Sequence, residues 1–260
     1  MCLILMAWRV HPDYPIVVAA NRDEFRQRPT AAAHWWPDRP QILAGRDLQS
    51  HGTWLGITRT GQIAALTNFR DPLHVKLDAP SRGGLVVNML ESSASISERV
   101  AQLRAASAEY AGFSLLCTDG RQLGVFESVA LAGRLLEPGI YGLSNHLLDT
   151  PWPKVQQAKS RLATALSLLP DDAALLNLLR DDQPAADDQL PRTGVSLEWE
   201  RLLSSAFIRG ADYGTRSSTV IRVDRDGSAH FKEWTWQADG CVGSQVSYRL
   251  QFGPAPAWVL

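Results

Sequence analysis

The chain has 260 residues, of which 45% are hydrophobic and 20% charged, and its formal net charge is −1. This composition supports a buried core, and the lack of a basic surplus argues against nucleic acid or a polybasic membrane patch as a partner. The apolar start has no basic region before it and no cleavage site after it, and no segment is long and apolar enough to span a bilayer. We therefore expect a cytoplasmic protein without a transmembrane segment.

The cysteines are Cys2, Cys117 and Cys241, an odd number at distant positions. This spacing argues against a disulfide framework and suits a reducing cytosol. No CxxC pair occurs and the His residues are scattered, so we expect no metal site.

The first part of the chain predicts antiparallel strands. Residues 2–10 and 16–20 are apolar and flank a turn containing two prolines, which predicts an N-terminal hairpin. Residues 25–41, rich in Pro, Arg and Trp, are interpreted as an irregular loop. Short runs separated by glycines then predict a meander at residues 42–44, 54–58 and 62–69.

Helices and strands alternate in blocks through the rest of the sequence. Helical spacing predicts helices over residues 81–91, 97–110, 151–169, 171–179 and 197–207. Further strands are predicted at 113–118, 122–128, 130–136, 215–223, 229–236 and 246–252, and the acidic, Pro-containing segment 181–194 predicts a surface loop. No repeat or linker divides the chain, so we expect one domain over residues 1–260. Two sheets with helices packed outside give an α+β fold.

Cys2 is notable for its position. Removal of Met1 would leave a residue that carries both a thiol and a free α-amine, and an amine with a pKa of about 7.7–8.0 can act as a base near neutral pH. Activation of a nucleophile by an N-terminal amine is an established scheme. The simpler alternative is a small apolar residue that starts a strand.

The run Asn21-Arg22-Asp23-Glu24 follows the second strand. A hairpin would bring it beside Cys2, where Arg22 could favour the thiolate and Asp23 could orient the α-amine. Asp23 and Glu24 point to opposite faces in an extended strand, which argues against a shared metal. The alternative is a polar strand end that enters a turn.

The segments MCLILMAWR, VVAANRDEFRQRP, GTWLGITRTGQIAALTNFRDP, GLSN and YGTRSSTVI resemble the NRDE-motif family, also called the transport and Golgi organisation family. The resemblance runs through nearly the whole chain. This family is similar in turn to choloylglycine and penicillin V acylases, which are N-terminal-cysteine amidohydrolases. The resemblance implies a four-layer αββα sandwich of N-terminal-nucleophile hydrolase type.

The resemblance also implies a set of site residues. Cys2 matches the nucleophile, and Arg22 and Asp23 match an Arg and an Asp that the acylases space differently. Asn68 resembles an oxyanion-hole residue, Asn145 a second active-site Asn, and Arg216 a late active-site Arg. Amide donors suit the oxyanion of acyl transfer, and an Arg can hold a carboxylate or a thiolate. Taken singly, each Asn could instead be a turn or cap residue and Arg216 a surface ion-pair partner.

Two functions remain open at this stage. The first is a cysteine amidohydrolase that acts on a non-peptide C–N amide bond and requires no cofactor. The second is a haem, acyl-coenzyme A or lipid carrier on the same scaffold, which the resemblance implies. Both take a small-molecule substrate or ligand. The run His34-Trp35-Trp36-Pro37, expected in a loop, is a candidate lip for ligand stacking or a packing element.

Overall fold

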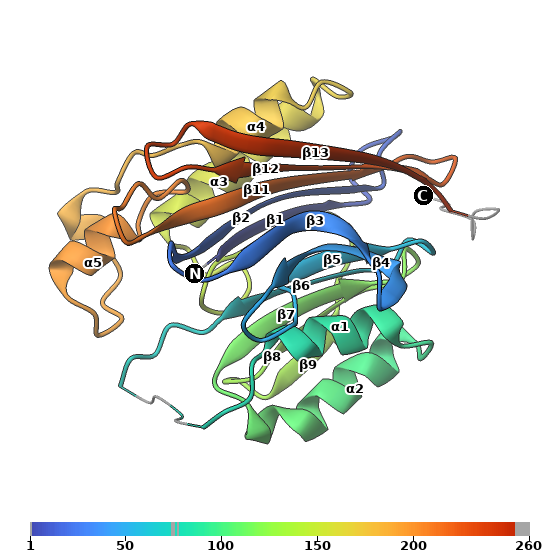
Figure 1. Ribbon diagram of the computed structural model, residues 1–260, viewed down its shortest axis with the longest axis horizontal. Helices are drawn as coiled ribbons and strands as arrows, with labels where there is room; N and C mark the ends of the chain where they lie inside the picture. Colours follow the sequence, from blue (N-terminus) through green and yellow to red (C-terminus); the bar gives the residue numbers. More distant parts are fainter. Residues whose placement is uncertain (1, 74–75, 77, 253–260) are drawn as a thin grey trace.

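The computed structural model describes residues 2–73, 76 and 78–252, and two antiparallel sheets stacked face to face form its centre (Figure 1). The first sheet, sheet A, has the strand order β10-β1-β2-β11-β12-β13. Its strands are β1 (Cys2–Trp8), β2 (Ile16–Phe25), β10 (Gly139–Leu143), β11 (Tyr213–Val223), β12 (Ser228–Trp236) and β13 (Val242–Gln251).

Sheet B has the order β3-β4-β5-β6-β7-β8-β9. Its strands are β3 (Thr30–Trp36), β4 (Arg39–Asp47), β5 (Leu55–Thr58), β6 (Ile63–Asn68), β7 (Phe113–Thr118), β8 (Leu123–Glu127) and β9 (Ala132–Leu135).

Helices cover the outer face of each sheet. The helices α3 (Pro153–Leu166) and α4 (Ala173–Leu179) pack on sheet A, and α1 (Gly83–Glu91) and α2 (Ile96–Ala106) pack on sheet B (Figure 1). The short helix α5 (Leu197–Leu202) adjoins a small separate cluster with Tyr213. The order helix–sheet–sheet–helix is the αββα sandwich that the sequence analysis expected. No helix in the described part of the chain is both long and apolar enough to cross a membrane.

The apolar run of β1 reflects burial on both faces. Ile4, Met6 and Trp8 belong to the core between the two sheets, whereas the alternate residues Leu3 and Leu5 pack beneath the helices on sheet A. Side chains alternate across a strand, so a strand covered on both faces needs apolar residues throughout. Burial of this kind contributes about 25 cal/mol per Å² of apolar surface.

The N-terminal hairpin forms as predicted. β1 and β2 pair antiparallel in a register that places Cys2 directly opposite Arg22. The sequence therefore predicted correctly that the strand end after Ala20 returns beside Cys2.

The irregular loop expected at residues 25–41 was wrong, because β3 and the start of β4 form a hairpin there. Trp36 is fully buried and donates its indole N–H to the Ala44 carbonyl at 3.0 Å, so it belongs to the core and not to a lip. The guanidinium groups of Arg46 and Arg59 lie over the rings of Trp36 and Trp35. Of the prolines that suggested a loop, Pro29 and Pro37 flank β3, and Pro40 is the second residue of β4; a strand tolerates proline near its ends.

Three further elements differ from expectation. β10 was not predicted, and it forms the edge of sheet A beside β1. The helix expected over 197–207 ends at Leu202. The helix expected from residue 81 begins at Gly83, and the residue before it, Arg82, provides no side-chain cap.

Candidate active site

A cleft of about 1060 Å³ opens beside the first residue of β1. Cys2, Arg22, Ser217 and Thr235 lie in one row across β1, β2, β11 and β12, and all four line the cleft. Directly paired residues of antiparallel strands project to the same face, so the strand register itself brings these side chains together.

The backbone of Cys2 is held by the segment after β10. Its N–H donates to Oδ1 of Asn145 at 3.2 Å, and its carbonyl accepts from the Ser144 hydroxyl at 3.1 Å. Met1 lies outside the described residues. Once Met1 is removed, the nitrogen that faces Asn145 is the α-amine.

Asn145 connects the two sheets. Its Nδ2 donates to the Asn68 carbonyl at 2.9 Å, and its own carbonyl accepts from the Arg70 N–H at 2.8 Å. The backbone of Asn145 is left-handed, with φ 55°, a region that Asn tolerates better than most residues. The Asn145 side chain therefore links the Cys2 nitrogen on sheet A to the Asn68 carbonyl at the end of β6 on sheet B.

The tetrapeptide 21–24 divides between the two faces of β2. Asn21 is fully buried toward the helices, where its Nδ2 donates to the carbonyls of Leu179 and Ala206, each at 2.7 Å, and its Oδ1 accepts from the Ser218 hydroxyl. Arg22 lines the cleft, with an Nη2 to Glu24 Oε2 distance of 3.7 Å. This split follows the alternation expected for an extended strand.

Asp23 is a buried carboxyl, 2% exposed. Its Oδ1 accepts from the Thr215 hydroxyl at 2.7 Å, and its carbonyl accepts from the Tyr213 hydroxyl. Burial raises the pKa of Asp23, and the nearby cations Lys154 and Arg22 act in the opposite direction. The carboxyl is held in place by groups from β11.

Lys154 is a further buried charge behind Asp23, and sequence reasoning missed it. Its Nζ donates to the Leu203 carbonyl at 2.8 Å, and burial, with Arg70 nearby, lowers its pKa to about 8. A signal was present, because Lys154 precedes Ala158 and Leu162 by four and eight residues and so falls on the apolar stripe of α3.

Burial raises the pKa of the Cys2 thiol, and the Asp23 carboxyl adds to that rise, whereas Arg22 opposes it. Arg22 lowers the pKa of the thiol, as expected. The effect of burial is larger, so the pKa of Cys2 is raised overall. A thiol with a raised pKa is a weak nucleophile at neutral pH and needs an adjacent base.

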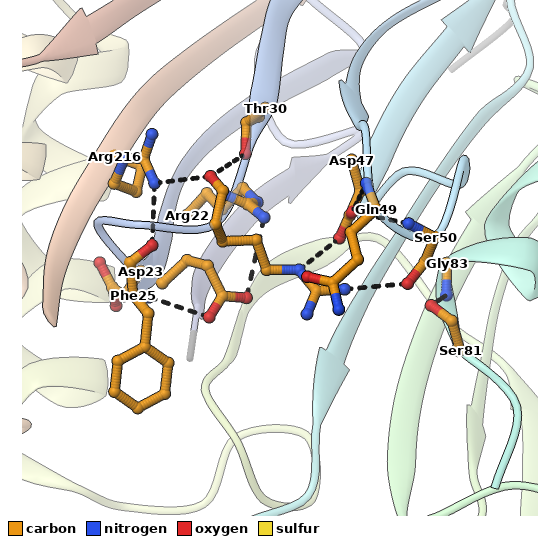
Figure 2. Close-up of polar contacts among 12 residues, drawn as sticks. Arg22, Asp23, Phe25, Thr30, Asp47, Gln49, Ser50, Ser81, Gly83 and Arg216 are labelled. Atoms are coloured by element: carbon orange, nitrogen blue, oxygen red, sulfur yellow. Dashed lines mark hydrogen bonds and ion pairs between the residues drawn. The ribbon is translucent and has the colours of Figure 1, made fainter. Parts of the chain in front are cut away.

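Asn68 and Arg216 reach the cleft in different ways. Asn68 ends β6 with an exposed side chain whose amide makes no hydrogen bond within the described residues. Arg216 occupies an irregularity between β11 and β2, where its Nη1 donates to the Phe25 carbonyl (Figure 2). The same Nη1 also donates to the carbonyls of Arg26 and Arg28. Asn68 is therefore free to donate to a ligand, and Arg216 braces the turn after β2.

The cleft lining is rich in charge. Its basic residues are Arg22, Arg28, Arg46, Arg70, Lys76, Arg82 and Arg216, and its acidic residues are Asp23, Glu24, Asp47, Asp71 and Glu233. Glu233 was also missed by sequence reasoning. Burial raises its pKa, and its carboxyl accepts from the Ala33 N–H at 2.7 Å, which joins β12 to β3.

No group of three or more His, Cys, Asp or Glu side chains in the described part of the chain is arranged to hold a metal ion. Haem usually takes an axial His, Cys, Met or Tyr ligand. Among the described lining residues, Cys2 is the one residue of these types.

Comparison with known proteins gives a consistent family match. A sequence model described as Transport and Golgi organisation 2 matches residues 1–238. The Transport and Golgi organization protein 2 homolog of Bos taurus is 37% identical over 266 residues, covering 90% of this chain and 92% of the relative. The homologs of Mus musculus and Homo sapiens are each 34% identical with the same coverage.

Solved structures give weaker likenesses. An N-acylethanolamine-hydrolyzing acid amidase ortholog from Caenorhabditis elegans matches with a TM-score of 0.48 and 12% identity, over 85% of this chain and 92% of that one. A mutant conjugated bile acid hydrolase from Clostridium perfringens matches with a TM-score of 0.44 and 9% identity, over 95% of this chain and 92% of that one. Both TM-scores lie below 0.5, and neither likeness supports an inference about chemistry.

Proposed function

This chain belongs to the Transport and Golgi organisation 2 family, and we propose that it is a cysteine amidohydrolase that cleaves a non-peptide C–N amide bond with Cys2 as nucleophile. The observation that carries the proposal is the hydrogen bond from the Cys2 nitrogen to Asn145 Oδ1, at the edge of the cleft that Cys2 lines. A freed α-amine at this position has a fixed orientation next to its own thiol.

The proposed reaction begins with proton transfer from the Cys2 thiol to the α-amine. The sulfur then attacks the amide carbonyl carbon, and the carbonyl oxygen becomes an oxyanion that the Asn68 amide stabilises. Collapse breaks the C–N bond, and the leaving amine takes the proton from the α-ammonium. Water then attacks the thioester, giving a carboxylic acid and restoring the thiol.

The remaining candidate residues orient the amine, adjust the pKa of the thiol or hold the surrounding backbone. Asn145 orients the α-amine, Arg22 offsets the upward shift of the Cys2 pKa, and Arg216 keeps the turn after β2 in place. Asp23 is buried on β2, opposite Thr215 and next to Arg22, which pairs with Cys2, and its carboxylate favours the ammonium form of the amine.

The test is a screen of N-acyl amides of a fluorescent amine, using protein whose N-terminal processing is known. We expect amine release by the wild type and none by Cys2→Ala. Asn68→Ala should lower kcat by roughly 10²–10³-fold, the usual effect of removing one oxyanion donor. Equal release by wild type and Cys2→Ala would refute the proposal.

Carriage of haem, an acyl-coenzyme A or a lipid is the second candidate, and the volume of the cleft is the observation that favours it. A carrier would bind its ligand and release it chemically unchanged. It would also retain binding in Cys2→Ala, apart from any haem bound through the thiol. Titration of wild type and Cys2→Ala with haem and with an acyl-coenzyme A, followed by mass analysis of the recovered ligand, separates the two functions.

A further inference from the structure

Arg82 is a cleft-lining cation to which none of the roles above is assigned. It lies just before α1, on the sheet B side of the cleft, in the turn where Ser81 contacts Gly83 (Figure 2). Its Nη1 donates to the Gly112 carbonyl at 2.9 Å, and it makes no ion pair with any described carboxylate. Its charge interacts with Cys2 and Glu24, so it belongs to the same electrostatic environment as the nucleophile.

Arg22 provides an independent observation on the sheet A side. The residue is 7% exposed, and its Nη1 is buried without a hydrogen-bond partner among the residues that the structure describes. Its contact with Glu24 Oε2, at 3.7 Å, is too long for a hydrogen bond. A buried guanidinium N–H without an acceptor is costly, and an acceptor supplied by a ligand would remove that cost.

Other arginines of the cleft already have their partners. Arg28 pairs with Asp47 at 2.8 Å, and Arg46 with Asp38 at 2.6 Å. Arg70 pairs with Glu200 at 2.8 Å. Among the described residues, Arg22 thus has a buried Nη1 without an acceptor, Arg82 has no carboxylate partner, and both lie in the electrostatic environment of Cys2.

We propose that Arg22 and Arg82 form an anion subsite beside Cys2 that binds a carboxylate or phosphate group of the ligand. A guanidinium presents a planar fork of donors that matches the oxygens of either group. The inference rests on the proposed function in one respect, namely that the ligand occupies this cleft next to Cys2. It adds that this ligand carries its negative charge near the bond that reacts.

The test compares iodoacetate with iodoacetamide, which differ in charge but alkylate by the same reaction. In both, the Cys2 sulfur bonds to the methylene carbon and iodide leaves. The protein carries Cys241→Ser, which removes the exposed thiol, and Cys117 is buried. Peptide mass spectrometry then reports the modification of Cys2.

We expect Arg82→Met to slow iodoacetate by about tenfold, the loss of one charge-assisted hydrogen bond. Iodoacetamide should keep its rate within about twofold, because a change in thiol pKa alone would alter both reagents equally. Arg82→Lys should recover part of the preference. Lys76→Met, which removes another cation from the same cleft, should leave the ratio of rates unchanged. An unchanged ratio in Arg82→Met would overturn the subsite.

If Cys2 reacts with neither reagent, that result would count against the proposed function alone. A binding measurement then tests the anion subsite separately. Inorganic phosphate and acetate are titrated calorimetrically into wild type and Arg82→Met at fixed ionic strength. Binding of phosphate, acetate or both that is lost in Arg82→Met supports the subsite and identifies the group it takes. Absence of binding, or equal binding by the two proteins, would overturn it.

Discussion

At the scale of single residues, neighbours in the 21–24 tetrapeptide have separate tasks. Asn21 ties the end of α4 and the segment at Ala206 to sheet A, whereas Arg22 faces the cleft. The motif therefore combines a structural residue with candidate reactive ones.

We predict that Asn21→Ala destabilises the fold strongly. The substitution leaves two buried carbonyls without their donor, at about 1–3 kcal/mol each, so the free energy of unfolding should fall by roughly 3–5 kcal/mol. Urea unfolding measures the loss. Glu24→Gln is the control, because its loose, partly exposed ion pair should cost less than about 1 kcal/mol. Similar losses in both variants would refute the structural role of Asn21.

Lys154 gives a prediction with a defined pH window. Its pKa is lowered from 10.5 to about 8 in the folded protein, so between these values the unfolded state binds more protons. The free energy of unfolding should therefore rise with pH across that window by about 3 kcal/mol, and the folded state bears the full cost of the buried charge below pH 8.

Lys154→Met should remove this rise, since no proton is left to bind at that position. Urea unfolding of both proteins at several values between pH 8 and pH 10 isolates the contribution as the difference between two curves. Curves that stay parallel would show that Lys154 remains protonated in the folded state.

At the scale of elements, the glycines before and within α1 allow it to dock. A Cβ on Gly52 would lie 2.6 Å from the backbone carbon of Gly83, so the loop after β4 and the start of α1 are in direct contact. Both residues line the cleft, and this contact sets the position of its sheet B wall.

Gly52→Ala should consequently cost about 1–3 kcal/mol of stability, because the backbone of Gly83 must move. Gly84→Ala is the matched control. A Cβ there meets nothing within 4 Å, and alanine is the better helix former by up to about 1 kcal/mol. Thermal unfolding compares the two. A neutral Gly52→Ala would mean that the contact is not close in solution.

The elements also show which sequence signals were sufficient. Continuous apolar runs identified β1 and the first part of β2, and the hairpin between them was enough to predict that Arg22 lies beside Cys2. β3 was not predicted because proline is usually typical of loops, whereas here Pro29 and Pro37 lie just outside the strand and leave its ladder intact. β10 was missed because its run of Gly, Ile, Tyr and Leu is short and lies at a sheet edge, where pairing with β1 decides its structure.

At the scale of the whole molecule, the candidate site depends on the stacking of the two sheets. Cys2 and Arg22 come from sheet A, Asn68 from sheet B, and Asn145 links Cys2 to Asn68 by hydrogen bonds. Spacing along the chain does not reveal that link, since Cys2 and Asn145 are 143 residues apart. The family resemblance suggested both asparagines, but only the tertiary structure shows that the Asn145 side chain is hydrogen-bonded and that the Asn68 amide has no partner within the described part of the chain.

Arg82 and Glu233 likewise become site residues through the stacking of the two sheets. Arg82 precedes a helix and Glu233 lies within a strand, and each becomes a cleft residue only when its sheet faces the other. Their local sequences carry no signal of that arrangement.

The central claim is that Cys2 acts with its own α-amine as the base, and this requires the removal of Met1. The most direct measurement is the intact mass of the protein purified from its native host. We predict a mass lower than that of the full chain by one methionine residue, with Cys2 as the first residue in N-terminal sequencing. A full-length mass would contradict it, because the Cys2 nitrogen would then be an amide without basicity.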